Sequence, residues 1–104
     1  MSRVDVLIVG AGAAGCVLAS RLSEDPQRTV LLVEAGPDLR WDEAPDEITG
    51  SSFNLARGLP DRVWNALDAV RAGDQPPRPY VRGLGVGGSS VVNAMVALPG
   101  HPDD

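Results

Sequence analysis

The stretch DVLIVGAGAAGCVLASRLSEDPQRTVLLVEAG, residues 5–36, predicts the fold of the chain. Residues 4–9 form a short β-branched apolar run, typical of a strand that is buried on both faces. A glycine-rich turn at residues 10–15 fits G-x-G-x-x-G, and residues 16–22 are good helix formers. A second apolar strand follows at residues 30–33. This order predicts an α/β fold with a Rossmann-like βαβ unit.

Each glycine of that turn has a physical role in holding a dinucleotide. Gly10 permits the tight turn, Gly12 lets the backbone approach a pyrophosphate, and Gly15 lets the helix pack close to the strand. The helix N-terminus presents N–H groups to the phosphates. Glu34 stands 19 residues after Gly15, where a carboxylate can accept hydrogen bonds from ribose hydroxyls. An acid there favours FAD or NAD over NADP. The alternative, an ordinary strand-to-helix turn, explains the acid less well.

A second glycine cluster lies in VRGLGVGGSSVVNAMVALPGHPDD, residues 81–104. It is no Walker A loop, because no lysine follows its glycines, and its bare backbone suits close contact with a flat or polyanionic ligand. We expect a helix to begin near Ser89 or Ser90, with its N-terminus facing the same ligand. A loop whose glycines serve only backbone geometry remains the alternative.

With 104 residues, the chain can form one domain at most. A net charge of -5 argues against nucleic-acid binding. The single cysteine, Cys16, forms no internal disulfide, and we expect it to pack behind the glycine turn. One histidine excludes a histidine-rich metal site. The glycine-interrupted N-terminal apolar stretch suits neither a signal peptide nor a membrane span, so we expect a cytoplasmic protein with no membrane partner.

The middle of the chain has a weak pattern. Residues 36–48 look like a solvated loop, and residues 51–60 suit a short helix capped by Ser51 or Ser52. Residues 61–72 fit either a helix, which periodicity favours, or an extended segment. Three prolines make residues 73–83 an extended connector. Trp41, Trp64 and Tyr80 either pack or line a ligand surface, and packing is the favoured interpretation.

Taken together, the two glycine motifs resemble the N-terminal part of the glucose–methanol–choline (GMC) oxidoreductases, which are FAD-dependent enzymes that oxidise alcohols. The resemblance implies one incomplete FAD-binding domain with three parts: a βαβ dinucleotide-binding unit (residues 1–36), a connecting segment (37–80) and a flavin-contacting loop with the start of a helix (81–104). It also favours extended chain around Trp64.

The resemblance further implies which residues contact FAD. The pyrophosphate would be held by Gly10, Gly12, Ala13, Ala14 and Gly15, and the adenosine ribose by Glu34 with Ala35. The flavin and its ribityl–phosphate arm would lie along Val86, Gly87, Gly88 and Ser89. The isoalloxazine ring would lie beside Asn93, Ala94, Met95 and Val96.

Several positions depart from the family pattern. Leu84 replaces a basic or polar residue, Ala94 a glycine and Ala97 an aromatic residue. Val92 stands where some members have a histidine that binds FAD covalently, so we expect non-covalent FAD.

The family's catalytic histidine region has no match here, and His101 is interpreted as a loop residue. We therefore expect the chain to be part of a longer enzyme for a small-molecule alcohol, its missing C-terminal part being in cis or on a separate chain. A non-catalytic nucleotide-binding module is the alternative. We expect exposed apolar surface, weak or no FAD binding and no turnover from this chain alone.

Overall fold

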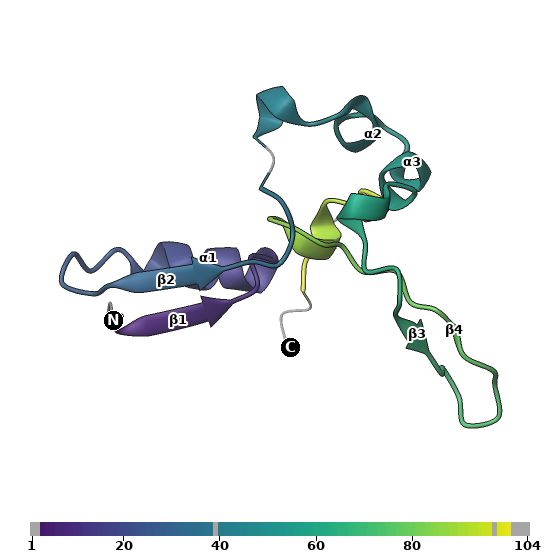
Figure 1. Ribbon diagram of the computed structural model, residues 1–104, viewed down its shortest axis with the longest axis horizontal. Helices are drawn as coiled ribbons and strands as arrows, with labels where there is room; N and C mark the ends of the chain where they lie inside the picture. The colour runs from purple at the N-terminus through teal and green to yellow at the C-terminus, as the bar shows by residue number, and fades with distance from the viewer. Residues whose placement is uncertain (1–2, 39, 97, 101–104) are drawn as a thin grey trace.

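The computed structural model of the chain describes residues 3–38, 40–96 and 98–100. A βαβ unit lies on one side of a glycine-rich centre, and short helices with a β-ribbon lie on the other (Figure 1). The first side consists of β1 (Val6–Val9), α1 (Ala13–Leu22) and β2 (Val30–Val33). The remaining elements are η1 (Trp41–Glu43), α2 (Asp46–Thr49), α3 (Phe53–Arg57), η2 (Pro60–Arg62), β3 (Asp68–Ala69), β4 (Arg78–Pro79) and η3 (Gly88–Ser90).

The βαβ unit confirms the predicted α/β class. Strands β1 and β2 are parallel and pair in register from Val6 with Val30 to Val9 with Val33. Helix α1 connects them and begins at Ala13, within the glycine motif, three residues before its predicted start. Parallel neighbours need such a crossover connection, which places the N-terminus of α1 at the carboxyl end of β1.

Only one face of the two-stranded sheet is covered, so the prediction that β1 is buried on both faces is wrong. Ile8 is buried toward α1, whereas Leu7 and Val9 are 57% and 80% exposed. Their register partners Leu31 and Val33 are also exposed. Side chains two residues apart share a face of a strand, so these four form one apolar surface opposite α1. The predicted exposed apolar surface is confirmed.

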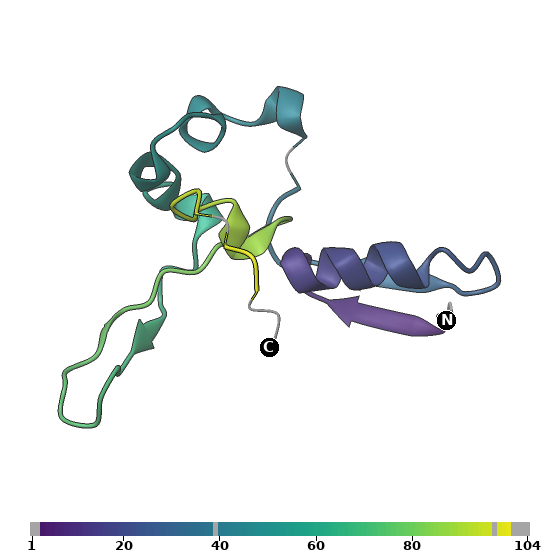
Figure 2. The same ribbon diagram turned by 180° about the vertical axis from the view of Figure 1, so that it is seen from behind.

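The connecting segment is more ordered than its sequence suggested. The acidic stretch interpreted as a solvated loop contains η1 and α2, so that interpretation is wrong in part. The predicted short helix is confirmed as α3, with Ser52 at its N-cap position, although no side-chain hydrogen bond caps it. Helices α2 and α3 pack against each other and curve above the ribbon (Figure 2).

A long β-ribbon forms where periodicity favoured a helix at residues 61–72, so the extended chain that the family resemblance favoured around Trp64 is confirmed. Strands β3 and β4 are antiparallel, and bonds from Trp64 N to Arg82 O (2.9 Å) and from Leu84 N to Arg62 O (2.7 Å) continue the pairing toward the centre. The proline-rich connector is extended, as predicted. The ribbon projects away from the rest of the chain (Figure 1). The radius of gyration is 16.5 Å, above the roughly 13 Å of a compact 100-residue domain.

The helix predicted after the second glycine cluster does not form among the described residues. One 3₁₀ turn, η3, is followed by irregular chain. Met95 has a φ of +57°, outside the right-handed helical region, so a regular helix cannot continue through this segment. Val92 instead turns inward and packs with Ala56 and Val63, which form a small buried cluster.

We predict that Gly15→Ala destabilises the βαβ unit by about 1–3 kcal/mol, because the new Cβ would overlap the carbonyl oxygen of Gly10. Urea unfolding followed by circular dichroism measures this. Gly73→Ala is the matched control, since a Cβ there meets nothing within 4 Å. Equal stability of the two variants would contradict the close packing of α1 against the turn.

Candidate cofactor site

The two glycine clusters, more than 70 residues apart in sequence, touch at the centre of the structure. The backbone N–H of Gly87 donates to the carbonyl oxygen of Ala11 (2.8 Å), and Gly12 and Gly87 form a parallel bridge. A Cβ on Gly88 would lie only 3.0 Å from the Cα of Gly12. This approach of one backbone to the other requires glycine, so the clusters form one surface.

Glu34, which follows β2, joins both clusters through its carboxylate. Its Oε2 accepts a hydrogen bond from the N–H of Ala11 (2.6 Å), and its Oε1 accepts from Gly36 (3.0 Å) and Gly85 (3.2 Å). A carboxylate offers about four acceptor positions, so one position remains for a further donor. The side chain is half-buried.

These contacts favour the ionised form of Glu34. Hydrogen bonds from the N–H groups of Ala11, above all, and then of Gly36 hold the pKa of Glu34 below its usual value, with a smaller effect from Gly85. Partial burial opposes the shift without reversing it. The carboxylate is therefore charged throughout the neutral range.

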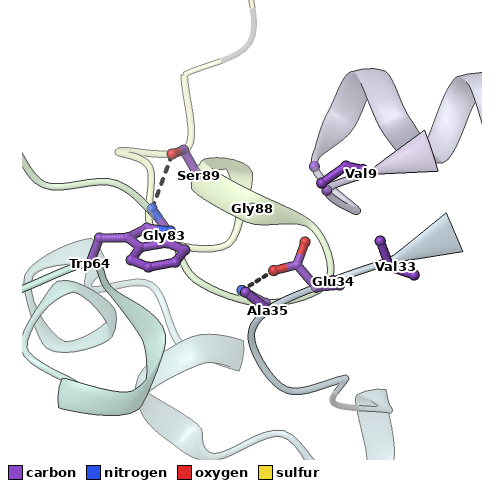
Figure 3. Close-up of a pocket in the computed structure, with 11 residues that line it drawn as sticks. Val9, Val33, Glu34, Ala35, Trp64, Gly83, Gly88 and Ser89 are labelled. Carbon is purple, nitrogen blue, oxygen red and sulfur yellow. Dashed lines mark hydrogen bonds between the residues drawn. The ribbon is translucent and has the colours of Figure 1, made fainter. Parts of the chain in front are cut away.

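An open cavity of about 650 Å³ lies beside this junction, within the range of small-molecule sites. Figure 3 shows Val9 and Val33 on one side of it, Trp64 and Gly83 on the other, and Glu34 between them. The Gly83 N–H donates to Ser89 Oγ (3.1 Å), which fixes the wall formed by the second cluster. The lining residues are Val9, Gly10, Gly12, Val33, Glu34, Ala35, Trp64, Gly83, Gly85, Gly88 and Ser89.

The glycine turn has the geometry that an anion site needs. Gly10 has a φ of +95°, which other residues rarely adopt, and turns the chain from β1 into α1. Gly12 is the N-cap of α1 and provides no side-chain cap, so the first N–H groups of the helix stay available to a ligand. A Cβ on Gly12 would meet no atom within 4 Å, so the space in front of it is open.

The structure gathers some of the predicted site residues at the cavity and leaves others elsewhere. Six line it: Gly10, Gly12, Glu34, Ala35, Gly88 and Ser89. Four lie directly behind the two turns, in α1 or in the second cluster: Ala13, Ala14, Gly15 and Gly87. Val86 faces a separate cavity of about 210 Å³ beside Pro37 and Ile48.

The segment predicted to pass beside the flavin ring lies outside this cavity. Asn93 Oδ1 accepts a hydrogen bond from Met95 N (2.6 Å), which closes a local turn in which Met95 has a φ of +57°. Ala94 and Val96 are exposed. Ala97 and His101, to which sequence analysis also assigned interpretations, lie outside the described residues.

Sequence reasoning missed five lining residues. Gly83 and Gly85 belong to the second cluster, so their position in it was an available signal. Val9 and Val33 end their strands at the sheet edge where nucleotides bind, which was also readable from the pattern. Trp64 was considered as a residue that lines a ligand surface, but packing was favoured, because only the long-range ribbon pairing brings it here.

Cys16 has the packing role that the sequence indicated. Its Sγ donates to the carbonyl oxygen of Ala11 (3.2 Å), behind the glycine turn, and Cys16 is not among the residues that line the main cavity.

Comparison with known proteins finds relatives that align with nearly the whole of this chain. Oxygen-dependent choline dehydrogenase of Klebsiella pneumoniae is 42% identical over 98% of this chain and 18% of its own length. The structure of pyridoxine 4-oxidase from Mesorbium loti superposes with a TM-score of 0.79 and 35% identity, covering 97% of this chain and 19% of that one. The chain belongs to the GMC oxidoreductase family.

Two further matches support and limit this assignment. A formate oxidase of Aspergillus oryzae, determined in work on FAD modification, has a TM-score of 0.70 at 38% identity and covers 98% of this chain and 18% of that one. Residues 5–77 match the family model described as lycopene cyclase protein. That match contains the βαβ unit and ends before the second glycine cluster, whereas the two relatives above align with 97–98% of this chain.

The chain spans about a fifth of the length of the relatives that it matches. The relatives are FAD-dependent oxidoreductases, and the matched region is their FAD-binding N-terminal part. Among the described residues, each helix is too short or too polar to span a bilayer.

We predict that Glu34→Gln lowers the free energy of unfolding by about 1–2 kcal/mol at neutral pH. The two oxygens of the Glu34 carboxylate accept three backbone N–H groups, whereas the glutamine amide has only one acceptor oxygen. The folded-state pKa of Glu34 is lowered, so its stabilisation is complete above the unfolded pKa and is lost as the pH falls through the folded pKa. The difference between wild type and variant should therefore shrink below a pH of about 4.

Urea unfolding across this pH range measures that difference. Glu24→Gln is the matched control, because Glu24 makes only an exposed ion pair with Arg21 at 2.7 Å. A pH-independent difference between wild type and Glu34→Gln would contradict the proposed role of the charge.

Proposed function

We propose that this chain is the FAD-binding N-terminal part of an oxidoreductase that oxidises a CH–OH group by hydride transfer to flavin. The observation that carries the proposal is the contact between the two glycine clusters around Glu34, because it forms one cavity from the two motifs that characterise the family. Bound FAD would supply the hydride acceptor, and the residues of this chain would bind and orient it.

The site divides into an anion-binding part and a diol-binding part. The pyrophosphate belongs at the N-terminus of α1, in front of Gly12, where N–H groups and the helix dipole favour negative charge. It does not belong beside Glu34, since two anions would repel each other. The remaining acceptor position of Glu34 suits a ribose hydroxyl.

The remaining predicted contacts follow from this arrangement. Gly10, Ala13, Ala14 and Gly15 would shape the pyrophosphate turn, and Ala35 would adjoin the ribose. The ribityl–phosphate arm would run along Val86, Gly87, Gly88 and Ser89 toward the flavin. Asn93, Ala94, Met95 and Val96 would contact the isoalloxazine ring once further segments of the whole enzyme surround it.

We propose that FAD is bound without a covalent link at the second cluster. Val92 replaces the histidine that some family members use, and its side chain is a hydrocarbon that packs with Ala56 and Val63. A buried aliphatic group has no nucleophilic atom with which to attach a flavin.

The substrate is proposed to be a small-molecule alcohol. No matched residue in this chain corresponds to the family's catalytic histidine, so that group would belong to the remainder of the enzyme. The apolar sheet face of Leu7, Val9, Leu31 and Val33 supports this view, because exposed apolar patches mark surfaces that pack against further protein.

We predict that Gly12→Ala weakens FAD binding roughly 10-fold or more without lowering stability. The structure has room for the Cβ and its φ of -74° suits alanine, but the methyl group would occupy the space in front of the helix N-terminus. Titration of FAD fluorescence measures the affinity, and urea unfolding measures the stability. Unchanged affinity would contradict the placement of the pyrophosphate.

Acid precipitation of the flavin-loaded chain tests the mode of attachment. We predict that all yellow colour remains in the supernatant, whereas flavin that stays with the pellet would show a covalent link.

A further inference from the structure

On the basis of the function proposed above, we propose that Arg57 and Arg82 form a subsite for an anionic group of the substrate. The alcohol that the enzyme oxidises then carries a carboxylate or a phosphate. The subsite is an open cavity of about 300 Å³ beside the second glycine cluster. Its walls come from α3, from the ribbon and from residues 89–94.

One small buried cluster brings these three segments together. Ala56 of α3 packs with Val63, at the base of the ribbon, and with Val92, which follows η3. Arg57 comes directly after Ala56, and Arg82 lies in the segment that pairs with the Val63 side of the ribbon. The main chain on both sides of the cavity is therefore fixed, and the two arginine side chains meet there although they are far apart in sequence.

An aromatic ring supports each of the two guanidinium groups. That of Arg82 lies 3.5 Å from the centre of the Tyr80 ring, and that of Arg57 lies 5.8 Å from the centre of the Phe53 ring. The face of an aromatic ring attracts a cation and leaves the N–H groups in the guanidinium plane able to donate. Arg82 uses one of them in a bond to the carbonyl oxygen of Val81 (2.8 Å). Both side chains thus have donors left for an anion.

No carboxylate of the described residues balances these two charges. Acidic residues outnumber basic ones in the sequence by 14 to 9, yet none of the described ones lines this cavity. The ion pairs in the described part of the chain involve Arg21, Arg28 and Arg40 instead. Two positive charges that face one cavity repel each other, and an anion bound between them would turn this repulsion into two attractions.

The other polar side chains of the cavity also offer donors. Asn93 Oδ1 accepts from Met95 N (2.6 Å), which leaves the Nδ2 group of Asn93 to donate. Ser89 Oγ accepts from Gly83 N (3.1 Å), so its hydroxyl hydrogen can point to a ligand. A cavity whose side-chain acceptors are occupied, and whose donors include two cations, favours a carboxylate or a phosphate over a neutral group.

The position of the cavity assigns the anion to the substrate. Ser89 lines both this cavity and the main one, so the two meet at the second cluster. Asn93 and Ala94, proposed above to contact the isoalloxazine ring, line it as well. Hydride transfer requires the CH–OH carbon of the substrate to lie against that ring, which brings a neighbouring substituent within reach of the arginines. The pyrophosphate of FAD is proposed at the N-terminus of α1 and is therefore not this anion.

The first experiment measures the binding of three related alcohols to the chain by amide chemical shifts at low salt. Glycerate and glycerol 3-phosphate carry the two anionic groups, and glycerol is the neutral control. Because both arginines are exposed, we expect dissociation constants on the order of 1 mM for the anions, rising with added salt. Shifts should be confined to residues 53–57 and 81–94, and the tighter ligand identifies the preferred group. No shifts with either anion, or equal shifts with glycerol, would overturn the subsite.

Variants of the chain separate the subsite from a general effect of charge. Arg57→Gln and Arg82→Gln should each weaken anion binding about 10-fold, as expected for lost hydrogen bonds to a charged group. Arg57→Lys should retain part of the affinity, because it keeps the charge and loses the planar fork. Arg78→Gln makes the same charge change on the ribbon outside the cavity and should bind like the wild type. Equal weakening by Arg78→Gln would overturn the subsite. Circular dichroism checks that each variant keeps its fold.

Kinetics of the whole oxidoreductase test the assignment to the substrate. A flavin-reduction assay compares pairs of alcohols that differ only in an anionic group. We expect the anionic member to have the higher kcat/KM, and Arg57→Gln to reduce its advantage about 10-fold, mainly through KM. Arg78→Gln should leave the ratio unchanged. Preference for the neutral member would overturn the inference and leave the proposed function intact, whereas oxidation of no alcohol at all would contradict the proposed function itself.

Discussion

The carboxylate of Glu34 is the group on which the rest of the site depends. It accepts hydrogen bonds from N–H groups of the first glycine turn, of its own turn and of the second cluster, 51 residues further along the chain. Hydrogen bonds to an ionised group are stronger than those between neutral groups, and partial burial protects them from competing water. Few side chains among the described residues are buried, so these polar contacts take part of the role that a hydrophobic core normally has.

The same contacts explain why the second cluster is so rich in glycine. Gly87 bonds to Ala11 and Gly88 lies against Gly12, so two backbones meet with no side chains between them. What remains exposed at the junction is mainly main chain, with one carboxylate and one helix N-terminus of opposite electrostatic character. A dinucleotide carries a matching pair of groups, an anionic pyrophosphate and a hydroxyl-bearing ribose. We therefore propose that the site recognises a dinucleotide through charge and backbone geometry.

The parts of the fold that depend on local sequence were predictable. The strands, the glycine turn and helix α1 follow from residues within one 32-residue stretch, and the acid at the end of β2 follows from its spacing. The ribbon at residues 62–84 was not predictable from periodicity, because Val63 fits a helical face equally well, and only the family resemblance favoured extended chain there. In the structure, the pairing of Val63 with Gly83 and its packing with Val92 decide the matter. The helix expected after Ser90 is missing for a local reason: Met95 has a positive φ, and its N–H donates to Asn93 Oδ1 in a tight turn.

The site was predicted in part for the same reason. Glu34 was identified as a ribose ligand from its spacing, but its bond to Gly85 needs the tertiary structure. Trp64 was interpreted as a packing residue, because nothing near it in the sequence indicates a ligand. Its place at the cavity results from ribbon pairing between segments about 18 residues apart, a non-local contact that periodicity cannot detect.

Amide hydrogen exchange of the chain, with and without FAD, tests most directly whether the two clusters form one site. The account predicts that FAD slows exchange in residues 10–16 and in residues 83–90 with the same dependence on ligand concentration, because both clusters contact one molecule. Protection confined to the first cluster, with exchange at Gly85 and Gly87 unchanged, would contradict it.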